Sequence, residues 1–367
     1  MILTGTQDSS RREDRPASRN SEQKAATTIG DAEGKTAESV TLTGTRKSSE
    51  DSSFAHQKKE KSIEIDGRGN IYSVAFLADG KHVVSGGQEG EIRRWRVDNG
   101  QEVGMPMDAG SAVYNIAVSR DGKWIVSGAW SGQVTVWNAE SHSIVTEWKA
   151  HYEVVKAVDV SPDGTRIATG SNDKTVCVWS LSRATGQRLL GPLEHDNKLT
   201  GVKFSPNGRL IAIATWTRVR VCDSDNGGHL VEFPIQVCSA MNQSLAWASD
   251  SKQLFALSSN RKIHCLDVST GTTLARWATH SNDVSCQCIA LASNGTFIAV
   301  YAHPWVSFWD TATREHIGSV IKQTHGVRSM AVSINYDLVI GGDKTVTLLR
   351  LCDILSSRYL DNVRVSA

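Results

Sequence analysis

The 367-residue chain lacks a charge imbalance, because 40 Lys and Arg residues face 39 Asp and Glu residues and the net charge is +1. This balance gives no electrostatic basis for binding nucleic acid or an anionic membrane surface. No apolar run has the length of a membrane span, and the N-terminus lacks the basic start and apolar core of a signal peptide. We therefore expect an intracellular protein, cytoplasmic or nuclear, without nucleic-acid or membrane partners.

Cysteine is scarce and odd in number, with seven residues of which Cys286 and Cys288 form the only close pair. A second cysteine pair at the spacing of a zinc site is missing, so we expect no bound metal. An odd number of cysteines fits a protein of a reducing compartment, where disulfides do not form. The sequence also lacks a Gly-rich phosphate loop and a Ser nucleophile elbow. The positions expected to point inward contain no acidic pair of the kind that hydrolytic enzymes need. These absences predict a protein without a cofactor and without enzymatic activity.

What the sequence does contain is one pattern repeated seven times. A turn residue marks each copy, and the steps between successive turn residues are 42, 42, 44, 43, 44 and 41. A second marker, at the end of a strand-like run, has the same period, and such a period is typical of repeat architectures. The turn residues are Asp79, Asp121, Asp163, Asn207, Asp250, Asn294 and Asn335.

Each copy is composed of short strands. Residues 175–179 alternate and are rich in β-branched and aromatic residues, whereas residues 167–170 form an almost continuous apolar run, as expected of a strand buried on both faces. Asp-Gly or Asn-Gly between two runs predicts a tight hairpin in five copies. In the other two, Ser251 and Tyr336 replace the glycine, and we expect those turns to be looser or of another type.

The Ser-Pro-Asp-Gly turn at residues 161–164, the Trp309-Asp310 pair and the Ala150-His151 pair together resemble the WD-repeat β-propeller family over residues 60 to 351. The resemblance implies an all-β fold of seven four-stranded blades around a central channel. It says little about function, because one fold supports many functions. The Gly-rich second strands are also similar in style to fungal propeller repeat proteins, in particular the propeller tails of nucleotide-binding signalling proteins.

The ring has to be closed, and two segments are candidates. Residues 61–66 alternate polar and apolar and align with the fourth strand of later copies, so we expect them to form the outer strand of blade seven. The rival closure uses residues 362–365. The expected organisation is a propeller over residues 60–367, preceded by a disordered low-complexity tail over residues 1–59, which is rich in Ser, Thr and charged residues.

Four residues of blade three match the hydrogen-bonded tetrad that the resemblance implies: His151, Thr169, Asp173 and Trp179. The set also resembles a catalytic His-Asp-hydroxyl arrangement. We favour a structural role, because buried polar atoms between strands need hydrogen-bond partners.

Partners of such propellers commonly bind where the starts of the first strands and the loops between the second and third strands converge. Each copy contributes the residue four positions before the apolar residue that ends its first strand, and the loops contribute exposed aromatic residues. Together these residues form an amphipathic and partly cationic rim. We expect it to bind a peptide or loop of another protein, acidic in character. The predicted rim comprises Tyr72, Tyr114, Trp130, Lys156, Trp216, Trp305 and Arg328.

The sequence therefore favours a noncatalytic interaction scaffold or peptide-recognition platform. Two alternatives stay open, a stand-alone sensor ring related to the propeller tails named above, and a propeller enzyme. The oligomeric state and the identity of the partner are not specified by these patterns.

Overall fold

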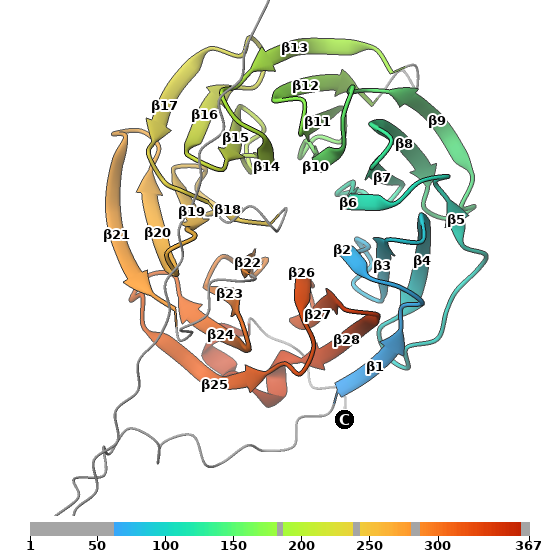
Figure 1. Ribbon diagram of the computed structural model, residues 1–367. Coiled ribbons are helices and arrows are strands. Elements are labelled where there is room, and N and C mark those ends of the chain that lie inside the picture. Colours follow the sequence, from blue (N-terminus) through green and yellow to red (C-terminus); the bar gives the residue numbers. More distant parts are fainter. Residues whose placement is uncertain (1–61, 182–185, 238–242, 280–286, 361–367) are drawn as a thin grey trace, which may run out of the picture. The chain divides into compact units, whose positions relative to one another are not determined.

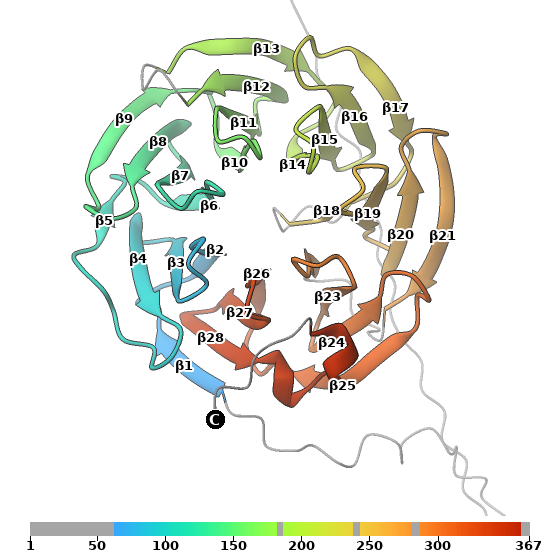
Figure 2. The same ribbon diagram turned by 180° about the vertical axis from the view of Figure 1, so that it is seen from behind.

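A computed structural model describes residues 62–181, 186–237, 243–279 and 287–360. Within these ranges the strands form seven antiparallel sheets of four strands, arranged as blades around a central axis (Figures 1 and 2). In both views the first strand of each blade lies nearest the axis. The architecture is thus the seven-bladed all-β propeller that the repeats predicted, whereas the tail expected over residues 1–59 and the rival closing residues 362–365 lie outside the described residues.

The blades follow one another along the chain. From the innermost strand outward, blades one to three are β2 (Ile71–Phe76), β3 (His82–Gly87), β4 (Glu91–Arg96), β5 (Met107–Asp108); β6 (Val113–Val118), β7 (Trp124–Ala129), β8 (Gln133–Asn138), β9 (Ile144–Lys149); and β10 (Val155–Val160), β11 (Arg166–Ser171), β12 (Thr175–Ser180), β13 (Arg188–Glu194).

Blades four to six continue in the same order. They comprise β14 (Leu199–Phe204), β15 (Leu210–Thr215), β16 (Val219–Asp223), β17 (His229–Phe233); β18 (Leu245–Trp247), β19 (Gln253–Leu257), β20 (Lys262–Asp267), β21 (Thr272–Ala278); and β22 (Gln287–Leu291), β23 (Phe297–Ala302), β24 (Trp305–Asp310), β25 (His316–Lys322).

Blade seven combines strands from the two ends of the repeat region. Its three inner strands are β26 (Val327–Val332), β27 (Asp337–Gly342) and β28 (Thr345–Arg350), and its outer strand is β1 (Ser62–Asp66). The register runs from Ser62 opposite Leu349 to Asp66 opposite Thr345.

The hydrophobic core is divided among the spaces between neighbouring blades. In β12, Val176 and Val178 pack toward blade four, whereas Cys177 and Trp179 pack toward blade two. Because successive residues of a strand point to opposite faces, a strand between two blades is apolar throughout. Gly170 allows close approach here, since a Cβ at this position would lie 2.6 Å from Cγ2 of Val202 in the next blade.

The expectation that the turns at Ser251 and Tyr336 differ from the Asp-Gly turns is wrong. Their φ angles are 59° and 60°, close to 68° at Gly164, and each backbone N–H donates to the carbonyl three residues earlier. A positive φ costs a non-glycine residue about 1–2 kcal/mol. Both side chains have compensating contacts, because the Ser251 hydroxyl accepts from the Asn207 N–H at 3.0 Å and the Tyr336 ring is buried in the core between blades six and seven.

A C-terminal segment of two short 3-10 helices, η1 (Leu351–Asp353) and η2 (Ser357–Tyr359), follows blade seven. Leu355 and Tyr359 are buried in the core between blades six and seven. The Tyr359 hydroxyl donates to Oδ2 of Asp310 at 3.0 Å. The segment therefore covers the interface between blades six and seven and does not start another repeat.

Candidate functional site

The inner strands carry a β-bulge at the same place in five blades. In blade one, Ile71 pairs with Gly87 and Ser73 pairs with Gly86, which leaves Tyr72 without an opposite residue. A bulge bends the strand and redirects the side chain of the extra residue. The bulged residues of the five blades are Tyr72, Tyr114, Lys156, Thr200 and Arg328.

Four of these bulged residues form an array of ring and cation contacts with a residue of the loop between β7 and β8. The Tyr72 and Tyr114 rings stack at 4.8 Å, and the Trp130 ring lies 5.7 Å from Tyr114. Nζ of Lys156 lies 3.9 Å from the Tyr114 ring centroid, and Cζ of Arg328 lies 5.5 Å from that of Tyr72. We call these five residues, from blades seven, one, two and three, the cation–aromatic arc.

The other two predicted rim residues lie away from the arc. Trp216 follows β15 in blade four and is 42% exposed. Trp305 begins β24 in blade six, where Nζ of Lys322 lies 5.7 Å from its ring centroid. The structure thus brings together five of the seven rim residues that the sequence singled out.

Charge and burial differ along the arc. Arg328 is paired with Asp343 at 3.1 Å. Burial, followed by repulsion from Lys198, lowers the pKa of Lys156 to about 8. Burial and then the neighbouring Tyr72 raise the pKa of Tyr114. The arc is therefore partly desolvated, and Lys156 carries a charge that its surroundings disfavour.

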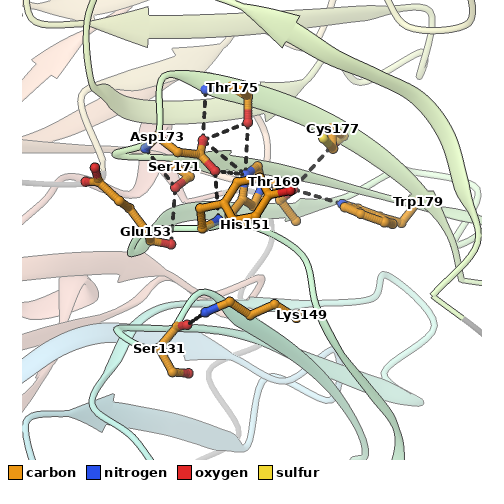
Figure 3. A network of polar contacts seen from close by, with 11 residues as sticks. Ser131, Lys149, His151, Glu153, Thr169, Ser171, Asp173, Thr175, Cys177 and Trp179 are labelled. Atoms are coloured by element: carbon orange, nitrogen blue, oxygen red, sulfur yellow. Dashed lines mark hydrogen bonds and ion pairs between the residues drawn. The ribbon is translucent and has the colours of Figure 1, made fainter.

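The tetrad residues of blade three lie in one hydrogen-bonded chain (Figure 3). Nε1–H of Trp179 donates to Oγ1 of Thr169 at 2.9 Å, and Nε2 of His151 lies 2.7 Å from that oxygen. Nδ1 of His151 lies 3.0 Å from Oδ2 of Asp173. Burial would raise the pKa of Asp173, but hydrogen bonds from His151 and Thr175 outweigh it and lower the pKa to about 2.

The first three blades carry a repeat that matches a known sequence family. The sequence model described as WD domain, G-beta repeat, matches residues 59–96, 107–138 and 142–180, which fall on the first blades of the seven-bladed ring. The three matched repeats and the seven four-stranded blades together support a WD-repeat β-propeller. Propellers of this family commonly serve as protein-interaction scaffolds and are typically not enzymes. Among curated proteins, none matches the chain.

Other blades replace the complete tetrad of a WD repeat by different arrangements. In blades one and two, Trp95 and Trp137 donate to Ser85 at 2.8 Å and Ser127 at 2.9 Å. In blade six, Trp309 donates instead to Ser307 of its own strand. The indole N–H groups of Trp95, Trp137 and Trp309 thus have hydrogen-bond partners without a full tetrad.

Blade four replaces the tetrad by charged groups. Arg220 occupies the register position that Cys177 has in blade three, and its guanidinium donates to Oε2 of Glu232 at 2.8 and 2.9 Å. The buried His195 lies beside Arg220, with Nδ1 3.5 Å from Nη1. Burial, and then the charge of Arg220, lower the pKa of His195 to about 4, so this imidazole is neutral at pH 7.

The structure also places a residue at this WD-repeat surface that the sequence analysis missed. Tyr152 is 94% exposed, and its backbone N–H donates to Oδ2 of Asp173 at 3.1 Å, so the tetrad fixes its loop. The loop adjoins that of Trp130, because the Gly132 carbonyl accepts from the N–H groups of Ala150 and His151. The available signal was an aromatic residue directly after the tetrad histidine and outside any strand.

The central channel of the propeller has mostly small aliphatic walls. A cavity of about 350 Å³ there is lined at one register level by five alanines and by Asp159 and Lys203, which form an ion pair at 2.9 Å. Asp159 is the one carboxylate among its lining residues. Gln243, just before β18, reaches this channel, and its side chain accepts from the Met330 N–H at 2.8 Å. The five alanines are Ala75, Ala117, Ala246, Ala290 and Ala331.

Metal-binding clusters and membrane-spanning helices are both absent from the described ranges. In that part of the chain, no three His, Cys, Asp or Glu side chains are grouped so that they could hold a metal ion. It contains no helix with the length and apolarity needed to cross a membrane.

Proposed function

We propose that this protein is a noncatalytic scaffold that binds other proteins by receiving a peptide or loop of the partner on the cation–aromatic arc. The observation that carries the proposal is the row of aromatic side chains that ends in exposed rings. Trp130 is 58% exposed, and Tyr152 on the adjoining loop is 94% exposed. Large apolar rings gathered in water favour a partner that covers them, and Tyr and Trp are common binding hot spots.

The channel supports a noncatalytic role. Asp159, its carboxylate, is paired with Lys203 and also accepts from the Phe204 N–H at 2.8 Å. A hydrolytic site needs two carboxylates at a matched separation. We therefore assign the channel walls a structural role and place the function on the loops.

The composition supports the class of partner and the location. The net charge of +1 favours a specific protein contact over a nucleic-acid or membrane surface. The cations of the arc favour an acidic segment in that partner. Cys177, Cys222, Cys265 and Cys352 are free thiols, which fits an intracellular, reducing compartment.

The test is affinity capture from the native cell with Tyr114→Ala combined with Lys156→Glu. We expect the partners retained by the wild-type protein to be lost, because the double variant removes the stacked ring and reverses the charge beside it. Circular dichroism should show an intact β-fold.

The matched control combines Ile334→Ala with Lys252→Glu. Both are exposed residues on the turns that follow the first strands, at the opposite ends of these strands from the arc. This variant should retain the partners. Capture of the same partners by a folded Tyr114→Ala, Lys156→Glu variant would show that the arc is not the binding site.

A further inference from the structure

The cations near the arc differ in whether a carboxylate neutralises them. Arg328 pairs with Asp343, Lys203 with Asp159, and Arg218 with Asp196 at 2.7 Å. In the described part of the chain, Lys156 and Lys198 have no carboxylate within ion-pair distance. These two lysines are the neighbouring cations of this surface that are left without an internal anion.

Keeping them together is unfavourable for the free protein. Lys156 is partly buried on β10, and Lys198 directly precedes β14, the first strand of the next blade, which packs beside β10. Burial and the charge of Lys198 both disfavour the protonated form of Lys156. One side of its ammonium group lies against the Tyr114 ring, and that ring is held by its stack on Tyr72. The group is therefore fixed in position and has lost part of its hydration. An anion that approached both lysines would relieve the repulsion and replace that lost hydration.

We propose that Lys156 and Lys198 form a seat for a single carboxylate of the partner segment, with Trp130 and Tyr152 receiving an apolar side chain next to it. This inference rests on the proposed function and gives it a ligand chemistry. A carboxylate is favoured over a phosphate because a partly buried site removes water from the bound anion, which costs less for one negative charge than for the nearly two of a phosphate. The arginine of the arc, whose fork binds either anion bidentately, is already paired with Asp343.

The seat predicts that binding takes up protons. Lys156 is about half protonated near pH 8, and a bound carboxylate favours its charged form. Affinity for a carboxylate should therefore fall as the pH rises from about 7 to about 9.5, over which Lys156 loses its proton in the free protein.

The experiment uses three fluorescently labelled peptides with a central tryptophan flanked by glutamates, by glutamines or by phosphoserines. At about pH 7, fluorescence anisotropy should show the glutamate peptide binding about tenfold more tightly than the glutamine peptide. The preference should shrink at about pH 9.5. It should disappear in Lys156→Gln and in Lys198→Gln, but persist in Lys174→Gln, which changes an exposed lysine of blade three.

Three outcomes would contradict the proposed carboxylate site. They are equal binding of the glutamate and glutamine peptides, no binding of any peptide, and a preference for glutamate that persists in Lys156→Gln. Tighter binding of the phosphoserine peptide that depends on both lysines would show that the anion is a phosphate. If the peptides bind without charge preference while Tyr114→Ala abolishes binding, the seat fails and the arc remains the binding site. If Tyr114→Ala leaves binding unchanged, the arc itself fails.

Discussion

Thr169 is the residue at which the polar groups of blade three meet. Its hydroxyl accepts from Trp179 and lies 2.7 Å from Nε2 of His151, and all three side chains are buried. Because the ionised carboxylate of Asp173 can only accept, Nδ1 of His151 carries the hydrogen of their contact. One oxygen atom therefore connects the strand network to the loop that carries Tyr152.

We expect Thr169→Val to lower the free energy of unfolding by about 1–3 kcal/mol, because it leaves the Trp179 N–H and Nε2 of His151 buried without a partner. Urea denaturation monitored by tryptophan fluorescence measures the loss. Thr169→Ser keeps the hydroxyl and should be close to wild type. A valine variant as stable as the wild type would mean that the tetrad adds nothing to blade three.

At the residue scale the sequence predicted positions better than contacts. Counting back from the apolar residues that end the first strands found Tyr72, Tyr114, Lys156 and Arg328, because the repeat period fixes their place in each blade. The ion pair of Arg328 with Asp343 and the exposure of Tyr152 were not predicted. Both depend on loop conformation, which a repeat pattern does not specify.

Blade four shows how an element can keep its four strands while its polar core changes. Arg220 and Glu232 replace the tetrad, and His195 is held neutral between them and the neighbouring strands. In the unfolded chain a histidine takes up a proton near pH 6.5, whereas in the folded chain it does so only near pH 4. The unfolded state therefore binds more protons in this interval, and stability falls as the pH drops through it.

We expect His195→Gln to lose less stability than the wild type between about pH 7 and about pH 5. Urea midpoints at the two pH values provide the measurement. His229→Gln, a change at an exposed histidine of β17, is the matched control and should follow the wild type. If His195→Gln and the wild type show the same drop, His195 is not the source of acid sensitivity in this blade.

At the element scale the blades were predictable because their signals are local. Asp-Gly turns and alternating strands lie within a few residues of one another, as in residues 161–179. The bulge at Tyr72 was not predictable, since it depends on how two strands pair. The packing of Tyr359 on blade six was also not predictable, because its hydroxyl bonds to Asp310, which lies 49 positions earlier in the sequence.

At the scale of the whole ring, β1 ties the start of the described chain to its last strand. Ile65 of β1 is buried in the core between blades seven and one, together with Ile71 and Leu348. The adjacent Glu64 is exposed. This alternation separates residues that hold the ring together from those that only face water.

We expect Ile65→Asp to lower the free energy of unfolding by about 3 kcal/mol or more and to broaden the transition, because it buries an unpaired charge at the ring closure. Chemical denaturation followed by circular dichroism measures both effects. Glu64→Gln should behave as the wild type. Equal stability of Ile65→Asp and Glu64→Gln would mean that the pairing of β1 with β28 does not hold the ring closed.

The pairing of β1 with β28 also has a consequence for biosynthesis. Translation produces Ser62 about 290 residues before Leu349, which at 5–20 residues per second corresponds to a delay of about 15–60 s. During this interval the first strand has no neighbour, and its backbone N–H and C=O groups are open to mispairing with other nascent chains. The yield of this protein in a cell should therefore depend on ribosome speed and on chaperones that shield the emerging chain.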